Sequence, residues 1–456
     1  MNIVSYMLSS IASWMAWIII PLVMEIVPAC ANFIILIKKA FRKRRIKELN
    51  YYPEITLIIP IYNSASSLKA CIRSIYESDY PAKLIHVLLV NNETTDQSFE
   101  VFTQCQSEFK DLSMVWLNAK QGKSKALNYA LFNSYGKYIV HIDSDGKLHP
   151  EALKNMITEF ENDEAIDCMT GTILTDPDQI EKTQGVLKRL FRKLEFFEYC
   201  QAFLAGRNFE SEFNSIYTVS GAFSAFRKST ILKTNLYNTD TVCEDTHITF
   251  QVREILKKRV HLCERAFFYV DPIEDINKLY TQRQRWQRGE IEVSHMFYKR
   301  RTNKGKAKLS NCVMNLLVYD HTFAFPRMIW YFALICLGFM NYSFKLILIS
   351  VCLMYALYVF GTLLFYINIA IILRFYPNIM KYYMKKWYLI FLLPLYNFMV
   401  FWFRFAGMIN SIKGEQTWRT RNLTEERREF MNIIKRDFGW FTSTQKKMEE
   451  RVNENG

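Results

Sequence analysis

The sequence predicts an α/β fold with a doubly wound, mostly parallel sheet inserted between transmembrane helices. Three observations support this. Short β-branched runs alternate with segments of helical spacing between residues 55 and 160, which is typical of a parallel sheet. One of these runs, Tyr138–Ile142, ends abruptly in two acids and a glycine. Apolar stretches at Ile11–Ile37 and Phe323–Ile409 are long enough for helices that cross a hydrocarbon layer of ~30 Å.

The charge pattern predicts on which side of the membrane the central region lies. The net charge of the 456 residues is +14, and the basic clusters adjoin the apolar stretches, at residues 38–45 and 299–306. By the positive-inside rule, the region between them lies in the cytoplasm of a multi-pass protein of the cell membrane. No aromatic-basic RNA motif occurs, so we expect no nucleic-acid partner. We expect an N-terminal transmembrane anchor with its basic flank (1–45), a cytoplasmic domain (50–300), transmembrane or interfacial helices (310–410) and a basic cytoplasmic tail (411–456).

The ten cysteines are scattered, without a CxxC pair or metal-ligand spacing, which suits a reducing compartment. The first apolar stretch has no small-residue cleavage site, so we interpret it as an anchor with its N-terminus outside. Glu25 lies within it, and two interpretations stay open: a polar path through the membrane, or a position at the interface.

The elements follow in order. The stretch Ile55–Ser64 predicts a first strand that runs into a loop. The other predicted strands are Leu84–Val90, Leu112–Leu117, Tyr138–Ile142, Cys168–Leu174 and Tyr217–Phe226. The predicted helices span about 66–75, 121–133, 150–160 and 187–209. One further helix begins near Val242, and another includes Gln282–Gly289. Gly171 and Gly221 mark positions where the backbone could approach a ligand closely.

The C-terminal apolar region predicts a hairpin of two spans, Phe323–Met340 and Lys345–Leu373. Trp387–Ile409 carries Pro394, Asn397 and Arg404, so it either crosses the membrane, or lies at its interface or re-enters on the same side. The basic residues that follow favour the second alternative, with the C-terminus inside.

Asp143 and Asp145 follow a buried strand at i and i+2. Ligands bind at the carboxyl ends of strands in such sheets, and two carboxylates there can hold Mg²⁺ or Mn²⁺, which can neutralise a diphosphate. Taken alone, however, an Asp-x-Asp-Gly sequence is more often a solvated turn.

The ordered set of motifs is more specific than any of its members. It consists of Pro60-x-Tyr62-Asn63, Lys123-x-x-Ala126-Leu127-Asn128, Asp143-x-Asp145, Ser220-Gly221-Ala222, Glu244-Asp245 and Gln282-x-x-Arg285-Trp286. Over residues 55–289 the chain resembles membrane-embedded family-2 glycosyltransferases of the processive type, such as poly-N-acetylglucosamine, hyaluronan, cellulose and chitin synthases. It is also similar to a narrower type found beside exosortase-like systems in Gram-positive bacteria.

The resemblance implies a GT-A-like fold, a nucleotide-sugar donor, a glycan or lipid-linked acceptor, contact with membrane lipid and an accessory membrane subunit. It implies Asp245 as the general base with Glu244 beside it, and Asp145 as the ligand of Mg²⁺ or Mn²⁺. It implies donor-binding residues Pro60, Tyr62, Asn63, Asn92, Lys123, Asp143 and Arg285. It implies acceptor-binding residues Gly221, Gln282 and Trp286, with Trp286 stacking on the sugar.

The sequence departs from the family at three places. Asn91-Asn92 stands where the family has two aspartates, so uridine as the nucleotide is less secure. Cys243 stands where cellulose synthases have threonine. The predicted spans are few for a secretion channel. Trp418–Arg421 is similar to a short element that follows the last span of hyaluronan synthases.

Three hypotheses follow. The first is an inverting, metal-dependent polysaccharide synthase, in which the cation and Arg285 relieve the charge of the leaving diphosphate and a carboxylate accepts the acceptor's proton. The second is transfer of a single sugar to a polyprenyl phosphate or another lipid. The third is an inactive membrane scaffold, which only Asn91-Asn92 favours. For Arg285-Trp286 the structural alternative is a helix lying on the membrane with an interfacial tryptophan.

Overall fold

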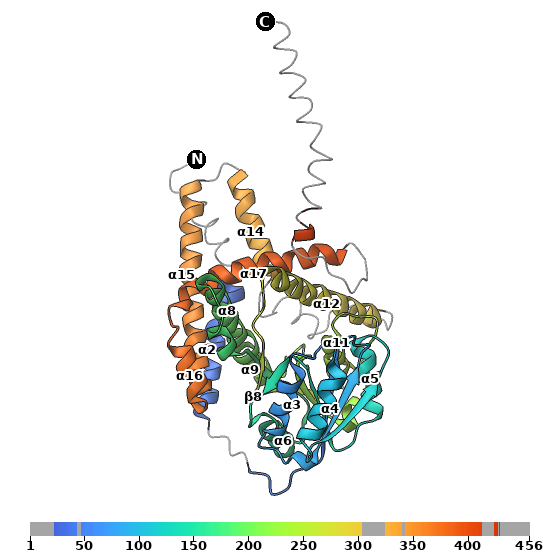
Figure 1. Ribbon diagram of the computed structural model, residues 1–456. Coiled ribbons are helices and arrows are strands. Elements are labelled where there is room, and N and C mark those ends of the chain that lie inside the picture. The colour runs from blue at the N-terminus through green and yellow to red at the C-terminus, as the bar shows by residue number, and fades with distance from the viewer. Residues whose placement is uncertain are drawn as a thin grey trace, which may run out of the picture.

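The computed structural model describes residues 22–42, 47–302, 324–339, 343–412, 424–426 and 428. Most of the predicted basic tail lies outside these residues, as do residues 1–21 of the predicted N-terminal anchor and Trp418–Arg421. The described chain consists of an α/β domain and a group of apolar helices beside and above it (Figure 1).

The sheet has eight strands in the order β3-β2-β1-β4-β7-β6-β8-β5. The strands are β1 (Ile55–Ile61), β2 (Ile85–Asn91), β3 (Ser113–Asn118), β4 (Tyr138–Ile142), β5 (Gly146–Leu148), β6 (Ile166–Thr175), β7 (Phe223–Arg227) and β8 (Arg259–Val270). The half formed by β1 to β4 is parallel, as predicted. In the other half β7 is antiparallel to β4 and β6, and β5 is antiparallel to β8, while β6 and β8 are parallel. The sheet is therefore mixed.

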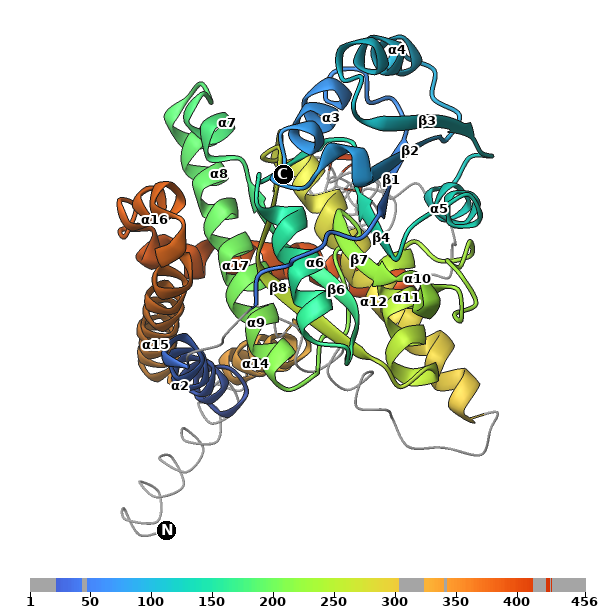
Figure 2. The ribbon, with the colours of Figure 1, turned by 90° about the horizontal axis from the view of Figure 1, so that it is seen from below.

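Helices cover both faces of the sheet (Figure 2). One face packs on α3 (Leu68–Tyr76), α4 (Ser98–Glu108) and α6 (Ala152–Asn162). The other packs on α5 (Lys123–Phe132), α10 (Lys228–Ile231) and α11 (Glu244–Phe250), which continues as η4 (Gln251–Ile255). The strands β4 and β6 are buried throughout, because helices remove both faces of the inner sheet from water, whereas the edge strand β3 is partly exposed. The short elements η2 (Ala82–Leu84) and α7 (Pro177–Glu181) connect larger ones.

The predicted helix over 187–209 is confirmed as a continuous unit of α8 (Val186–Tyr199), η3 (Cys200–Gly206) and α9 (Arg207–Glu212). The predicted strand Tyr217–Phe226 is wrong in its first half, where residues 217–222 form a loop that leads into β7. Gly171 packs against protein: a Cβ there would lie 2.1 Å from the Phe223 ring. The prediction that a ligand approaches this glycine was therefore wrong.

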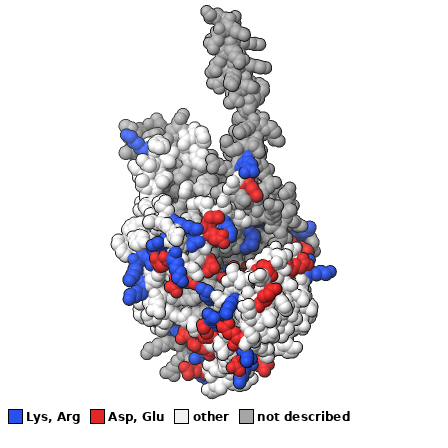
Figure 3. All heavy atoms as spheres, viewed as in Figure 1, with Lys and Arg blue, Asp and Glu red and all other residues white. Residues whose placement is uncertain are grey.

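The apolar helices comprise η1 (Leu22–Ile26) with α2 (Val27–Phe41), α14 (Ala324–Phe339), α15 (Phe344–Ile372) with η5 (Leu373–Phe375), α16 (Pro377–Met384) and α17 (Leu389–Ile412). Among the described residues, two helices are long and apolar enough to cross a membrane, Phe344–Phe375 and Leu389–Ser411. On the face in Figure 3, charged side chains cover the lower part of the molecule, whereas the upper helices carry few.

The helix α17 lies at a steep angle to α15 and runs along α12 (Ile276–Thr302) (Figure 1). Its Arg404 is fully buried and donates to Oε1 of Gln287 on α12 at 3.1 Å. A Cβ at Gly407 would lie 2.7 Å from the carbonyl oxygen of Gln284, so the two helices are in close contact.

Candidate active site

The acids of the Asp-x-Asp motif lie where β4 ends, beside the switch from parallel to antiparallel pairing. The backbone N–H of Asp143 donates to the carbonyl oxygen of Ala222 at 3.1 Å, which ties the motif to the loop before β7. The Ser144 and Ser64 hydroxyls are 2.7 Å apart and tie it to the loop after β1. The strand end thus holds both acids between two loops of distant sequence.

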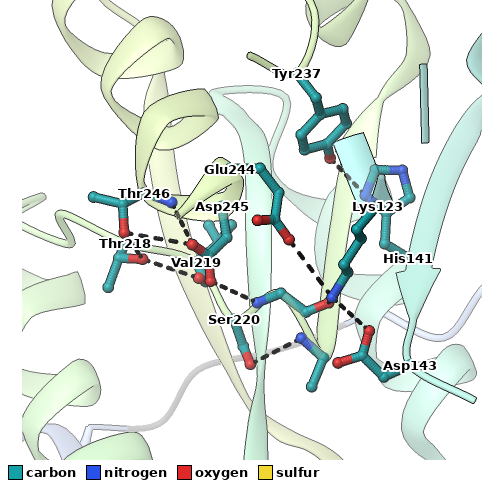
Figure 4. Close-up of polar contacts among 12 residues, drawn as sticks. Lys123, His141, Asp143, Thr218, Val219, Ser220, Tyr237, Glu244, Asp245 and Thr246 are labelled. Atoms are coloured by element: carbon teal, nitrogen blue, oxygen red, sulfur yellow. Dashed lines mark hydrogen bonds and ion pairs between the residues drawn. The ribbon is translucent and has the colours of Figure 1, made fainter. Parts of the chain in front are cut away.

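Lys123 is the centre of the site's charges. It begins α5, and its Nζ lies 2.6 Å from Oδ1 of Asp143 and 3.6 Å from Oε1 of Glu244 (Figure 4). It also donates to the carbonyl oxygen of Gly221 at 3.3 Å. Burial would lower the pKa of Lys123, but Asp143 and Glu244 together raise it, so the ammonium is charged.

Glu244 and Asp245 form the first turn of α11, where carboxylates interact favourably with the helix dipole. Burial raises the pKa of Glu244, and the charge of Asp245 adds to this, while Lys123 opposes it. Oδ2 of Asp245 accepts from the backbone N–H of Gly221 at 3.2 Å, and Oδ1 accepts from the N–H of Thr246 at 2.7 Å. Figure 4 shows Asp245 facing the loop at Ser220. Its carboxylate is half-buried and oriented by two backbone donors.

Asp145 is solvent-exposed at the same strand end. Desolvation by the surrounding protein and the charge of Asp143 raise the pKa of Asp145 to about 6. Two carboxylates that repel each other are a suitable donor set for a hard cation, since both offer oxygen ligands. Among the described residues no group of three or more His, Cys, Asp or Glu side chains could hold a metal. A bound Mg²⁺ or Mn²⁺ would therefore need oxygen atoms of the substrate or water to complete its shell.

The predicted nucleotide-side residues lie in neighbouring loops. Tyr62 is 53% exposed, and Pro60 lies one residue before the end of β1. Oδ1 of Asn63 accepts from the N–H of Thr95 at 3.0 Å, which holds the loop after β2. Oδ1 of Asn92 accepts from the N–H of Gly122 at 2.6 Å, directly before Lys123. In the structure, therefore, Asn63 and Asn92 position loops around the site.

The Gln282-x-x-Arg285-Trp286 motif lies on α12, close to Glu244. A Cβ at Gly289 would lie only 2.0 Å from Sγ of Cys243, so α12 contacts the residue before Glu244 directly. Arg285 is exposed, and its charge acts on Glu244. Trp286 is half-buried and packs edge-on against Phe203 with ring centroids 6.1 Å apart.

The neighbour of this motif, Arg283, was missed by the sequence analysis. Its guanidinium lies 4.4 Å from the ring centroid of Trp286 and forms a buried ion pair with Glu198 of α8. It also donates to Oε1 of Gln282. The motif is thus fixed from its buried side by Arg283, and among the residues that the structure describes no hydrogen bond joins Trp286 to the acids. Arg283 stands at one of the two variable positions of the motif, so the sequence gave no sign that it supports Trp286.

Two buried groups beneath the site were also missed. His141 on β4 has Nδ1 2.6 Å from the hydroxyl of Tyr237, and burial with the charge of Lys123 lowers the pKa of His141 to about 3, so it is neutral. Arg207 is buried and donates to Oγ1 of Thr170 at 3.2 Å. That hydroxyl also accepts from the N–H of Ser220 at 3.0 Å, so Arg207 lies under the Ser220-Gly221 loop.

The mixed sheet with acids at its switch point defines a GT-A-like fold. The chain is similar to a mannosyltransferase from Pyrobaculum calidifontis solved in complex with GDP-mannose and Mn²⁺, with a TM-score of 0.56 and 16% identity, over 87% of this chain and 99% of that one. At this identity the likeness concerns the fold alone.

Residues 56–233 match the family model described as glycosyl transferase family 2. This match supports a glycosyltransferase. It is 24% identical over 239 residues to a poly-beta-1,6-N-acetyl-D-glucosamine synthase of Staphylococcus epidermidis, covering 52% of this chain and 55% of that protein. The corresponding synthase of Staphylococcus aureus (strain COL) is 23% identical over the same shares. The chain thus spans about half the length of the curated relatives it matches.

Proposed function

We propose that this protein is an inverting, metal-dependent membrane glycosyltransferase that moves a sugar from a nucleotide-sugar onto a growing β-linked polysaccharide. One observation carries the proposal: Lys123, Asp143, Glu244 and Asp245, from three separate segments, meet around the loop at Gly221. The match of residues 56–233 and the similarity to polysaccharide synthases support the same class of reaction.

Asp245 accepts the proton of the acceptor hydroxyl in this proposal. The acceptor oxygen forms a bond to the anomeric carbon as the bond from that carbon to the diphosphate breaks, and the electron pair leaves with the nucleoside diphosphate. Attack from the opposite face inverts the configuration. The backbone donors at Gly221 and Thr246 orient the carboxylate for this task.

The leaving diphosphate needs positive charge, which Lys123 and Arg285 offer from the protein. Asp145, with Asp143 beside it, would hold Mg²⁺ or Mn²⁺, and the cation when bound would supply further charge neutralisation. UDP is the first nucleotide to test, although Asn92 replaces an aspartate there. Trp286 offers an aromatic face to the acceptor sugar.

We also place the protein in the cell membrane as a multi-pass protein with the sheet domain in the cytoplasm. The two apolar helices at Phe344–Phe375 and Leu389–Ser411 are long and apolar enough to cross a membrane, which supports a location in the membrane. An ion pair between Glu25 and Arg327, 2.7 Å apart, joins η1 to α14, as expected for charges that must be paired inside apolar surroundings.

The test is release of nucleoside diphosphate by the purified protein from a panel of nucleotide-sugars, with Mn²⁺ or Mg²⁺. We expect Asp245→Asn to lower turnover by roughly 10²–10⁴-fold while nucleotide binding by calorimetry persists. Asp240→Asn is the matched control, since Asp240 is exposed five residues earlier. Normal turnover in Asp245→Asn would refute the assignment of the base. Absence of any nucleotide binding would favour the scaffold hypothesis.

The second candidate is transfer of one sugar to a lipid, and one observation favours it. A cavity of about 890 Å³ lies between α2, α14, α15, α17 and α9, and aromatic side chains line much of it, including Trp330, Tyr331, Phe398 and Trp402. Such a lining suits a hydrocarbon chain. Product length distinguishes the candidates: one sugar per lipid excludes the polysaccharide synthase.

A further inference from the structure

A second large cavity lies away from the site, at the junction of the apolar helices and the sheet domain. Its volume is about 770 Å³, and it is formed where α2 and α15 end beside α6, α9 and β8. We call it the seam pocket. It shares no lining residue with the group around Lys123. Its basic lining residues are Lys39, Arg42, Arg259, Arg265 and Arg374.

Two of these cations are already neutralised. Lys39 lies 3.0 Å from Glu212 and 3.1 Å from Glu264, and Arg259 lies 3.0 Å from Asp163. The other three, Arg42, Arg265 and Arg374, form no ion pair with the residues that the structure describes. Glu159 also lines the pocket, 3.1 Å from Nε2 of His261. The five Lys and Arg side chains therefore face four carboxylates, and the surplus of positive charge rests on the three arginines outside ion pairs.

The aromatic ring of Phe375 positions two of these guanidinium groups. That of Arg265 lies 4.3 Å from the ring centroid and that of Arg374 lies 4.7 Å from it. An Arg374 N–H also donates to the carbonyl oxygen of Ala40, which joins the ends of the two apolar helices. Stacked guanidinium groups keep donors available in their plane, which suits bidentate binding of phosphate oxygens.

The apolar residues that line the seam pocket indicate which kind of phosphate-bearing molecule it binds. Leu36 of α2 and Ile371 and Ile372 of α15 line the same cavity as the arginines. A ligand that satisfies both parts carries an anionic head and a hydrocarbon chain. We propose that the seam pocket binds the phosphate headgroup of an anionic membrane phospholipid, with its acyl chains along the apolar ends of α2 and α15.

The seam pocket also connects to the candidate active site. Nζ of Lys39 donates to Oδ1 of Asn208 on α9 at 2.5 Å. The residue before it, Arg207, contacts Thr170 under the Ser220-Gly221 loop. Helix α9 thus links the lipid site to the loop that orients Asp245. The expectation that lipid alters turnover rests on the proposed function, whereas the expectation that the seam pocket binds lipid does not.

The experiment measures binding by calorimetry to the full-length protein in uncharged detergent. The probes are short-chain phosphatidylglycerol, short-chain phosphatidylcholine and free glycerol 3-phosphate. Each basic contact strengthens binding of an anionic lipid roughly fivefold, so we expect the triple variant Arg42→Gln/Arg265→Gln/Arg374→Gln to bind phosphatidylglycerol at least ~10-fold more weakly. The control is Lys83→Gln/Lys110→Gln/Lys233→Gln, which removes three exposed cations elsewhere, and it should bind like the wild type.

Two results together support the proposal. The triple variant loses binding of phosphatidylglycerol, and the wild type binds the other two probes at least ~10-fold more weakly than phosphatidylglycerol. Equal binding by the triple variant and the wild type overturns it. Glycerol 3-phosphate binding as tightly as phosphatidylglycerol overturns the lipid source. If the triple variant melts at a lower temperature than the control, the single variants Arg265→Gln and Arg374→Gln decide, each with an expected loss of roughly two- to fivefold.

Turnover separates this proposal from the proposed function. If nucleoside diphosphate is released but phosphatidylglycerol neither binds nor alters the rate, the lipid site is wrong and the enzyme assignment stands. If phosphatidylglycerol binds as expected and no nucleotide-sugar is turned over, the lipid site stands and the enzyme assignment is wrong.

Discussion

The backbone of Gly221 joins the two charged parts of the candidate site, since its N–H donates to Asp245 at 3.2 Å and its carbonyl oxygen accepts from Lys123 at 3.3 Å. A Cβ at this position would lie 3.1 Å from Oδ2 of Asp245 and 3.5 Å from Nζ of Lys123. The glycine therefore leaves open the space beside the proposed base.

Gly221→Ala tests the need for that space. The added methyl group would press on the Asp245 carboxylate and occupy volume where an acceptor hydroxyl must approach, so we expect turnover to fall at least ~10-fold. The free energy of unfolding should change by less than about 1 kcal/mol, because the neighbouring carboxylate can shift slightly. Diphosphate release and denaturant unfolding measure the two quantities. Unchanged turnover would contradict the proposed approach of the acceptor.

Replacing Lys123 by methionine tests its role between the acids. Asp143 and Glu244 would lose their shared cation, so we expect the free energy of unfolding at pH 7 to fall by about 1–3 kcal/mol, together with a loss of activity. The difference in unfolding free energy from the wild type should narrow as the pH falls and Glu244, whose pKa is raised by burial, takes up a proton. Lys147 is more exposed than Lys123 and pairs with one carboxylate, that of Asp176, so Lys147→Met should cost less than about 1 kcal/mol. If both variants lost the same free energy of unfolding, this would contradict a special role of Lys123 between the acids.

Gly289→Ala tests the contact between α12 and the Glu244-Asp245 turn. The methyl group would lie 2.0 Å from Sγ of Cys243, so the helix or the turn must move, at a cost of about 1–3 kcal/mol and with reduced turnover. Adding Cys243→Ala should restore part of both losses, since it removes the sulfur. Gly338→Ala is the control, because a Cβ there meets nothing within 4 Å. Wild-type turnover in Gly289→Ala would show that this contact does not position Asp245.

The buried carboxyl group of Glu195 on α8 should make the free energy of unfolding depend on pH. Burial raises its pKa to about 7, so the folded protein holds this proton more tightly than the unfolded chain does. Its contribution to stability is therefore present at acidic pH and is lost as the pH rises through about 7, by up to ~3 kcal/mol. Glu195→Gln keeps an acceptor for the N–H of Ile273, which bonds to Glu195 at 3.0 Å, but cannot ionise. In denaturant unfolding, the stability of the variant relative to the wild type should increase from pH 5 to pH 8. If the difference in unfolding free energy between the two proteins did not change with pH, Glu195 would not titrate in this range.

Local patterns were sufficient to predict the first half of the sheet. β1, β2, β3 and β4 are β-branched runs whose pairing is parallel and whose crossovers are short helices, so each unit carries its own signal. The pattern did not predict β8, because its long pairing with β6 joins segments about 90 residues apart. α4 was missed as well, because its apolar residues form only a weak helical pattern.

The sequence by itself determined the acids, the lysine and the order of the motifs, because residue types at fixed spacing at the ends of strands and helices are local properties. Only the tertiary structure decided that Lys123 lies between Asp143 and Glu244, that residues 217–222 form a loop, and that Arg283 and Arg207 support the site from below. These relationships depend on contacts between segments tens of residues apart. Such contacts arise from packing against the sheet and leave no periodic trace along the chain.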